Sequence, residues 1–248
     1  MYKSLKKKVL DGDTVIGAWM MTVNPAFAEI ASSLDIDFLV VDMEHGAIAL
    51  ADLPNILRGF NGSTVPIVRV PSAEPTLIAR VLDRGARGIM VPRINDVETA
   101  RVAARAAKYP PFGDRGLALP ALRASDYGLN PLYRDQANSD FLTIIQLESR
   151  SAIASAIDIG NEPGVDMVFI GPTDLAADLQ LEGAAHQEAL NQIINDAAKR
   201  CEEQEIPIGT ITYGGRSVKD LKSAGFQMLV VGSDVGMLRE ALSSLPKM

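Results

Sequence analysis

Eight short segments rich in valine and isoleucine recur along this chain, and each is followed by a turn signal and then by a helical pattern. The segments occupy residues 15–20, 38–43, 66–70, 88–91, 141–147, 167–170, 207–211 and 227–231. Most are apolar at consecutive positions, which is typical of strands in a parallel sheet whose outer face is covered by helices. The 248 residues match the length of a typical (β/α)8 barrel. We therefore predict an α/β fold in which residues 1–248 form a single (β/α)8 TIM barrel as one domain.

The composition is that of a globular enzyme and disfavours several other classes of protein. Hydrophobic residues make up 47% of the chain and charged residues 22%, which permits a large core and is unlike a disordered chain. The net charge is -7 and basic residues are not interleaved with aromatic ones, so we expect no nucleic-acid partner. No long apolar segment follows the basic run Lys6 to Lys8, so we expect no membrane partner, a solvated first helix and a cytoplasmic location.

Cysteine and lysine positions limit the chemistry further. Cys201 is the single cysteine, which rules out an internal disulfide and a multi-thiolate zinc site, and its charged neighbours predict an exposed or half-buried side chain. No lysine lies within or directly after any of the eight segments. A Schiff-base mechanism, which needs a lysine in the barrel, is therefore disfavoured. One long connection, residues 109–140, separates the fourth and fifth segments, and long connections in compact domains tend to be functional.

Polar side chains stand at the ends of these segments, where a (β/α)8 barrel assembles its active site. Charged side chains at the end of a buried strand are costly unless they are paired, hydrated or bound to a metal. Their convergence on one end of the barrel predicts an active site. These residues are Asp42, Glu44, His45, Arg69, Arg93, Gln146, Glu148 and Asp174.

Glu148 and Asp174 follow consecutive strands, which a barrel places side by side, so their carboxylates can reach one cation. Two carboxylates completed by waters and substrate oxygens suit Mg²⁺ or Mn²⁺. The alternative is that each carboxylate caps the helix that follows it. Spacing alone gives the two interpretations equal weight.

His45 and Arg69 have side chains that suit proton transfer and anion binding. His45 follows the second segment and can titrate near neutrality, although a structural histidine bonded to a carboxylate is the alternative. Arg69 lies between two valines in a central strand and needs a buried anionic partner there. Its planar guanidinium suits a substrate carboxylate or a developing enolate oxygen. Backbone N–H groups in residues 169–175 are a further seat for a carboxylate.

Five motifs in order along the chain resemble the HpcH/HpaI family of class II pyruvate aldolases. The family includes 4-hydroxy-2-oxoheptanedioate and 2-keto-3-deoxyglucarate aldolases, and the resemblance runs from about Ile16 to the last strand. Any one motif is weak evidence, but five in register make chance similarity improbable. The motifs are DMEH (42–45), VRVP (68–71), LDRGARGIMVP (82–92), QLE (146–148) and FIGPTDL (169–175).

The resemblance implies a metal-dependent aldol addition of the pyruvate enolate to an aldehyde, or the reverse cleavage of a 4-hydroxy-2-oxoacid. Glu148 and Asp174 would coordinate a divalent metal, most often Mg²⁺ or Mn²⁺, with Co²⁺ or Zn²⁺ as the other options. Arg69 would stabilise the enolate, and Gln146 would lie beside the substrate. Backbone N–H groups near Thr173 and Asp174 would hold the pyruvate carboxylate.

The remaining implied roles concern proton transfer and assembly. His45 would transfer protons, with Asp83 as the acidic residue that orients it, and Asp42 and Glu44 would support the site. Members of the family are typically homo-oligomers, trimers or hexamers, that exchange a C-terminal helix and share residues between subunits. We expect the same assembly here.

The chain departs from the family at two places, and two other functions stay open. The loop at 117–120 reads LALP, where glycine and small polar residues are commoner; because this loop borders the aldehyde side in the family, the aldehyde is uncertain. Asp174 is followed by Leu-Ala rather than Leu-Ser. The nearest alternative is a metal-dependent 2-oxoacid decarboxylase or CoA-ester lyase that uses the same enolate, since fold cannot separate these. A non-catalytic oxoacid-binding protein is the second alternative.

Overall fold

The computed structural model describes residues 4–34, 36–181 and 186–246, and its eight strands close into a parallel barrel. Each strand pairs with the next in the chain, and β8 pairs with β1 to complete the ring. The predicted TIM barrel is confirmed, and the predicted strand bounds differ from the observed ones by at most two residues. The strands are β1 Val15–Met20, β2 Phe38–Asp42, β3 Val65–Arg69, β4 Gly88–Val91, β5 Leu142–Leu147, β6 Met167–Ile170, β7 Ile208–Ile211 and β8 Met228–Ser233.

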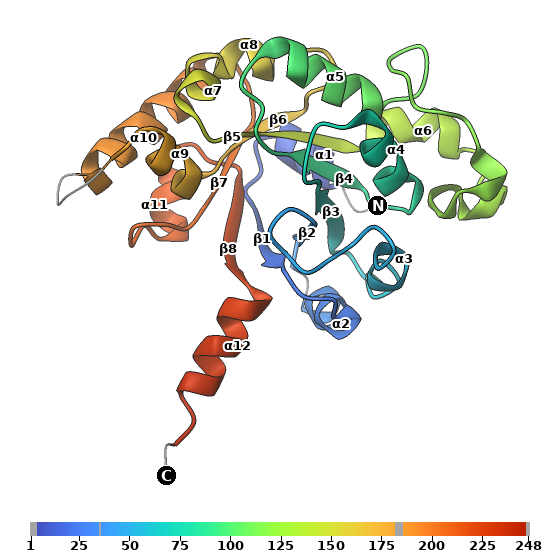
Figure 1. The fold of residues 1–248 in the computed structure, drawn as a ribbon, viewed down its shortest axis with the longest axis horizontal. Helices are drawn as coiled ribbons and strands as arrows, with labels where there is room; N and C mark the ends of the chain where they lie inside the picture. Colours follow the sequence, from blue (N-terminus) through green and yellow to red (C-terminus); the bar gives the residue numbers. More distant parts are fainter. Residues whose placement is uncertain (1–3, 35, 182–185, 247–248) are drawn as a thin grey trace.

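Helices surround this ring (Figure 1). Two of them begin with an acidic cap: the Glu74 side chain accepts hydrogen bonds from backbone N–H groups at the start of α4, and the Asp96 side chain does so at the start of α5. The helices are α1 Leu5–Leu10, α2 Pro25–Ser33, α3 Leu53–Ile56, α4 Pro75–Asp83, α5 Val97–Ala107, α6 Tyr133–Asp140, α7 Arg150–Ala154, α8 Ala156–Gly160, α9 Pro172–Asp178, α10 His186–Glu203, α11 Val218–Ser223 and α12 Asp234–Ser243, with 3-10 turns η1 Leu119–Ala121 and η2 Arg123–Gly128.

The strands are apolar on both faces because they contribute to two hydrophobic clusters. One cluster includes Val40, Ile67 and Phe169, and the other includes the neighbouring strand residues Val41 and Val68 together with helix residues. Successive strand residues point to opposite faces of the sheet, so consecutive apolar residues supply both clusters. Two buried clusters hold the strand ends in place around the mouth of the barrel.

Cys201 lies on α10 and is fully buried, so the prediction of an exposed or half-buried thiol is wrong. Its helix buries one face, which also carries Leu190, Ile194 and Ala198. Cys201 shares the helical spacing of these apolar residues, and this spacing decided its position rather than its charged sequence neighbours. Burial raises the pKa of the Cys201 thiol to about 11, which makes it a poor nucleophile.

The first helix is held by ion pairs at the amino ends of the strands and is not simply solvated as predicted. Lys6 Nζ lies 2.6 Å from Asp166 Oδ1, and Lys8 Nζ lies 2.6 Å from Asp37 Oδ1. Lys108, which follows α5, is buried beside the Asp166 carboxylate as well, with its Nζ 3.7 Å from Asp166 Oδ2. Two amino groups therefore share one aspartate in this buried cluster.

Lys108 should make the stability of the barrel depend on pH. Burial lowers its pKa from 10.5 to about 8, although Asp166 opposes the shift. Between these pH values the unfolded chain binds more protons than the folded one, so the free energy of unfolding rises with pH. From pH 7 to pH 9 the contribution of Lys108 should rise by about 1 kcal/mol. Urea unfolding at both pH values should show this gain in the wild type relative to Lys108→Met; an equal difference between the two proteins at both pH values would contradict it.

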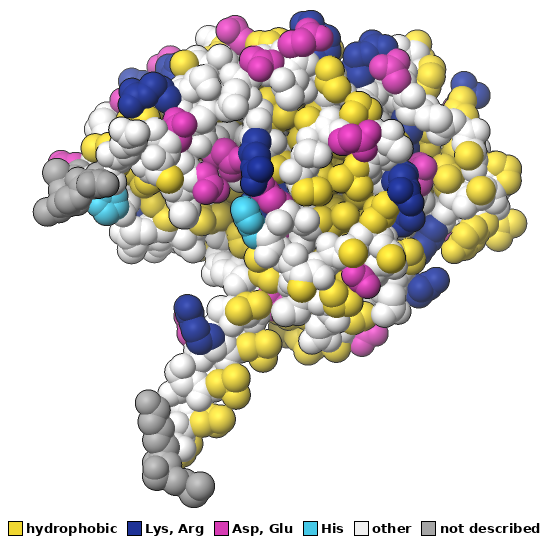
Figure 2. All heavy atoms as spheres, viewed as in Figure 1, with side chains coloured by type: hydrophobic (Ala, Val, Ile, Leu, Met, Phe, Trp, Pro, Cys, Tyr) yellow, Lys and Arg dark blue, Asp and Glu magenta, His cyan; other side chains and the backbone are white. Residues whose placement is uncertain are grey.

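The last helix, α12, projects away from the barrel (red in Figure 1). Its start is fixed, because the Asp234 carboxylate accepts hydrogen bonds from the backbone N–H groups of Met21 and Thr22. Beyond this point apolar side chains are exposed, including Leu238 at 56% and Leu242 at 65%. Figure 2 shows hydrophobic side chains along the projecting segment. In the part of the chain that the structure describes, no helix, α12 included, is long and apolar enough to cross a membrane.

Candidate active site

Asp42 and Arg69 form a buried ion pair at the carboxyl ends of β2 and β3. The two residues are register partners in the sheet, and Asp42 is fully buried. Arg69 Nε donates to Asp42 Oδ1 at 2.8 Å, and Arg69 Nη2 donates to Asp42 Oδ2 at 2.7 Å. This is the buried anionic partner that the sequence required for Arg69. The paired, parallel bonds fix the plane of the guanidinium group.

Glu44 joins the arginine pair to the histidine. Its Oε2 lies 3.2 Å from Arg69 Nη1 and 3.8 Å from His45 Nε2, and its Oε1 lies 3.2 Å from Arg93 Nε. Burial raises the pKa of the Glu44 carboxyl, an effect that Arg69 and His45 oppose and Glu148 reinforces. The His45 side chain is 53% exposed, so it can exchange protons with solvent or substrate at the mouth.

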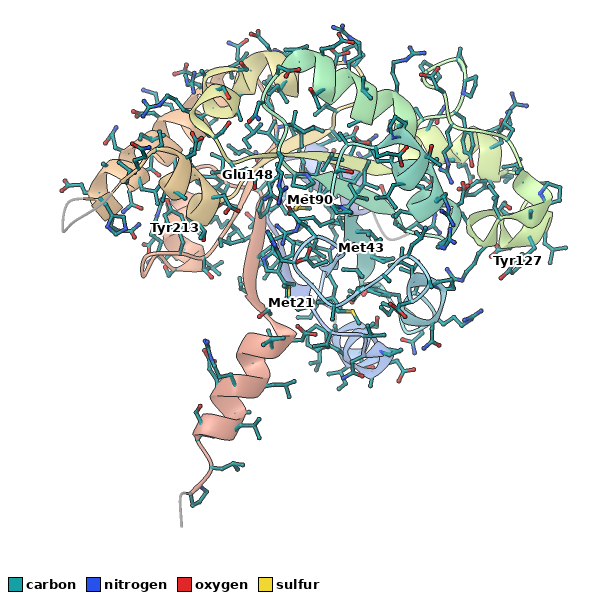
Figure 3. The ribbon with its side chains drawn as sticks, viewed as in Figure 1. Met21, Met43, Met90, Tyr127, Glu148 and Tyr213 are labelled. Atoms are coloured by element: carbon teal, nitrogen blue, oxygen red, sulfur yellow. The ribbon has the colours of Figure 1, made fainter. Side chains whose placement is uncertain are left out.

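Glu148, directly after β5, is a buried carboxylate whose partners in the structure are N–H groups. Its Oε1 accepts from the backbone N–H of Arg93 at 2.9 Å, and its Oε2 accepts a short hydrogen bond from Gln146 Nε2. The cap of the following helix is Ser149, whose side chain accepts from Ala152 N. Helix capping, the alternative role for Glu148, is therefore wrong. Figure 3 shows Glu148 near Met90 of the neighbouring β4.

Asp174 lies in the first turn of α9, and the loop that leads to it passes next to Glu148. A Cβ added to Gly171 would lie 3.2 Å from Gln146 Nε2 and 3.4 Å from Glu148 Oε2. The absence of a side chain at Gly171 therefore lets the loop pass close to these two side chains. The residue at the start of α9 is Gly171, so no side chain caps this helix, and Asp174 is exposed. An acidic residue in a first helical turn is also favoured by the helix dipole, so capping electrostatics remain an alternative for Asp174.

Two carboxylates at this mouth are not paired with an arginine. Asp42 and Glu44 form ion pairs with Arg69 and Arg93, whereas Glu148 accepts only from N–H groups, and neither Glu148 nor Asp174 makes an ion pair among the residues that the structure describes. Among the residues described, no group of three or more His, Cys, Asp or Glu side chains is arranged to hold a metal ion by itself. Two carboxylates whose remaining ligands come from water and substrate fit a divalent cation of the Mg²⁺ type.

Asp83 and the long connection 109–140 lie at the other end of the barrel from this mouth. Asp83 ends α4, which returns toward the start of β4, and it accepts hydrogen bonds from Arg115 at 2.7 and 3.1 Å. The connection leads from α5 into β5, and its Tyr127 lines one cavity with Val65 and Leu142, at the starts of β3 and β5. Figure 3 shows Tyr127 far from Glu148.

Within one chain, therefore, Asp83 does not orient His45, and the 117–120 loop does not border the chain's own mouth. The cause is topological. Helices return antiparallel to the strands, so a helix end and the connection that follows it lie at the amino ends of the strands.

Trp19 of β1 is a site residue that the sequence analysis missed. The guanidinium carbon of Arg69 lies 4.3 Å from the centroid of the Trp19 ring, within cation–π range, and Trp19 packs edge-on against Phe169. The signal was available, since Trp19 is the single tryptophan of the chain and lies in the first predicted strand. The face of the sheet to which the Trp19 side chain points is set by the register of the strands in the barrel, which the sequence alone does not give.

A closed barrel whose strand ends gather a fixed arginine, carboxylates and an exposed histidine has the arrangement of a TIM-barrel enzyme, whose active site lies at the carboxyl ends of the strands. The HpcH/HpaI aldolase/citrate lyase family model matches residues 15–241, and the chain belongs to that family. It is accordingly an aldolase, a carbon–carbon lyase. The predicted resemblance is confirmed.

Similar proteins share this architecture over nearly their whole length. A 2-dehydro-3,6-dideoxy-6-sulfogluconate aldolase of Pseudomonas putida is 36% identical, covering 93% of this chain and 90% of its own. A hydroxypyruvate/pyruvate aldolase of Roseovarius nubinhibens is 34% identical, with 96% and 93% covered. The crystal structure of an HpcH/HpaI aldolase/citrate lyase family protein from Burkholderia cenocepacia J2315 superposes with a TM-score of 0.90 at 30% identity, covering 96% of each chain.

Proposed function

We propose that this aldolase adds the enolate of pyruvate to an aldehyde, and in reverse cleaves a 4-hydroxy-2-oxoacid, with a divalent metal ion at Glu148 and Asp174. The observation that carries the proposal is the buried Glu148 carboxylate, which makes no ion pair within the described residues and lies beside the Gly171 loop that leads to Asp174. Oxygen ligands favour Mg²⁺ or Mn²⁺, and Co²⁺ or Zn²⁺ are the other options. A bound divalent ion polarises the keto group and lowers the cost of charge on its oxygen.

Arg69 stabilises the oxygen on which negative charge develops. Asp42 orients its guanidinium from behind, Trp19 covers one face of it, and Nη1 lies 3.5 Å from Gln146 Oε1 and so is directed toward the Gln146–Glu148 pair. A donor held in place before the reaction costs no reorganisation when the charge forms. Gln146, whose amide also donates to Glu148, lies beside the substrate in this arrangement.

The first turn of α9 seats the pyruvate carboxylate. Pro172 has no N–H, and the N–H groups of Thr173 and Asp174 lie in the first turn, where helical N–H groups have no acceptor within the helix. These donors, with the positive end of the helix dipole, favour an anion at this point. The carboxylate therefore lies beside the two proposed metal ligands.

His45 moves the protons. It accepts the methyl proton of pyruvate, directly or through a water, and returns a proton to the new alkoxide. Glu44 Oε2 lies 3.8 Å from its ring nitrogen Nε2. Asp83 can orient His45 only from a second subunit, because the two residues of one chain lie at opposite ends of the barrel. This role for Asp83 requires an oligomer.

The exposed apolar side of α12 supports such an oligomer, with trimers or hexamers as the expected states. Val235, Leu238 and Leu242 on this helix, and Leu245 just after it, are each at least 48% exposed. Exposed leucines of this extent on a projecting helix are typical of a surface covered by another subunit. Helix exchange between subunits would bury them.

Deuterium exchange at the methyl group of pyruvate tests the proposed function. In ²H₂O, the chain with Mn²⁺ should exchange the methyl protons without any aldehyde, and EDTA should abolish exchange reversibly. The near-isosteric variant Glu148→Gln removes a charged ligand and should lower Mn²⁺ affinity in titration calorimetry by at least about 100-fold, more than the loss of a residue that only supports a ligand. Aldol products with glycolaldehyde, glyceraldehyde or succinic semialdehyde complete the assay. Chelator-resistant exchange would contradict the metal assignment, and no adduct with any aldehyde would contradict the aldol assignment.

A further inference from the structure

Arg93, the second residue after β4, has a backbone fixed in an unusual conformation. Its φ of 58° lies in the left-handed region, which residues other than glycine adopt rarely. Its N–H donates to Glu148 Oε1 at 2.9 Å, and its neighbours Pro92 and Ile94 are buried. Such conformations persist where the surroundings hold them, and they gather at ligand sites. The Arg93 side chain therefore starts from a fixed point beside a proposed metal ligand.

The guanidinium group of Arg93 is only partly used by the protein. Arg93 Nε lies 3.2 Å from Glu44 Oε1, and Glu44 is shared with Arg69 and His45. The side chain is 68% exposed, and within residues 4–34, 36–181 and 186–246 it makes no other ion pair or hydrogen bond. The Nε of the guanidinium thus meets a shared carboxylate, whereas its two terminal nitrogens make no hydrogen bond or ion pair with the described residues.

We propose that Arg93 binds a carboxylate at the far end of the aldehyde and thereby selects anionic aldehydes over neutral ones. The inference rests on the proposed function. The reacting carbon lies inside, at Arg69 and Glu148, whereas Arg93 and His45 stand further out. An aldehyde that approaches the enolate from solvent passes Arg93, and a planar guanidinium can donate two parallel hydrogen bonds to a carboxylate.

Two other arginines at this end are less suited to the same role. Arg69 is 7% exposed and is bound by Asp42 and Glu44. Arg216, on the loop after β7, donates to the hydroxyl of Tyr213 at 2.8 Å and lies over the Tyr213 ring. Arg216 is nevertheless a matched control, because it places a similar charge at the same end of the barrel, after β7 rather than β4.

The test compares two aldehydes of four carbons that differ in charge, succinic semialdehyde and butanal, as partners for pyruvate with the Mn²⁺-loaded chain. The measured quantity is the ratio of kcat/KM for the two aldehydes, in which any change common to both cancels. Arg93→Met keeps the stem and the backbone N–H, and it should lower the ratio at least about tenfold. Arg93→Lys should recover part of the loss, and Arg216→Met should change the ratio by less than about threefold.

Two results would overturn the inference. One is a ratio in Arg93→Met within about threefold of the wild-type ratio. The other is an equal fall in Arg216→Met, which would indicate the summed electrostatic potential of the mouth rather than a contact with Arg93. Exchange of the pyruvate methyl protons by the wild type separates this test from the proposed function. If exchange occurs and the ratio is insensitive to Arg93, only the role of Arg93 fails. If neither exchange nor an adduct is seen, the proposed function fails, and the inference fails with it.

Discussion

Arg69→Ala should lower kcat for aldol cleavage by at least about 100- to 1,000-fold, the usual cost of removing a fixed donor from a developing oxyanion. The structure adds a second effect. Asp42 is fully buried and takes two hydrogen bonds from Arg69, so the variant leaves a buried charge without its partner. This should destabilise the barrel by about 3 to 5 kcal/mol. Loss of activity in Arg69→Ala is therefore ambiguous unless stability is measured as well.

Two matched variants separate catalysis from stability. Arg69→Lys keeps a positive charge opposite Asp42 but lacks the planar fork, so it should fold nearly as well as wild type and still lose most of kcat. The double variant with Asp42→Asn added to Arg69→Ala removes the unpaired charge, and it should recover melting temperature without recovering activity. Steady-state kinetics with thermal unfolding of each variant would decide. A well-folded Arg69→Lys with near wild-type kcat would show that Arg69 does not act on the enolate.

Replacing Leu238 and Leu242 of α12 by glutamate should dissociate the proposed oligomer. Both leucines are more than half exposed in the single chain, on the part of α12 that projects from the barrel. Burial of a leucine contributes about 2 kcal/mol, so losing two should weaken association roughly a thousandfold for each exchanged helix. Sedimentation velocity would measure the change. Folding should survive, because α12 packs mainly against β1 and β8 near its first residues.

Glu240→Lys is the matched control, because Glu240 lies on the opposite side of α12 from these leucines at 100° per residue. It should leave the oligomer intact. An unchanged sedimentation coefficient in the leucine variant would contradict the exchange of this helix. If the variant dissociates and also loses methyl-proton exchange, the proposal that a second subunit supplies Asp83 gains support, because each site would then need its neighbour.

Much of the site was predictable because local pattern and topology agree in a barrel. Consecutive apolar residues are typical of strands that are buried on both faces. Eight such strands in series close into a barrel, and their carboxyl ends meet at one end of it. Arg69 illustrates this: valines on both sides required burial, burial required an anion, and Asp42 on the neighbouring strand is that anion. The convergence of Glu44, Gln146 and Glu148 follows from the same register.

Errors arose where position depends on more than order along the chain. Cys201 was judged from its charged neighbours, but its helix turns it into the core together with Ile194 and Ala198. Asp83 and the 117–120 loop are a different case: the family resemblance implied their roles beside the site, and within one chain both lie at the opposite end of the barrel. A sequence motif does not state which subunit a residue serves.

The sequence determined the barrel, the strand ends and the set of chemical groups found there, because short-range periodicity and residue type carry that information. The tertiary structure decided how those groups are used. It made Ser149 rather than Glu148 the helix cap, it placed Trp19 against Arg69, and it turned Arg93 so that its backbone serves Glu148 while its side chain faces solvent. These outcomes depend on register and on one left-handed residue, which long-range packing sets and local sequence does not.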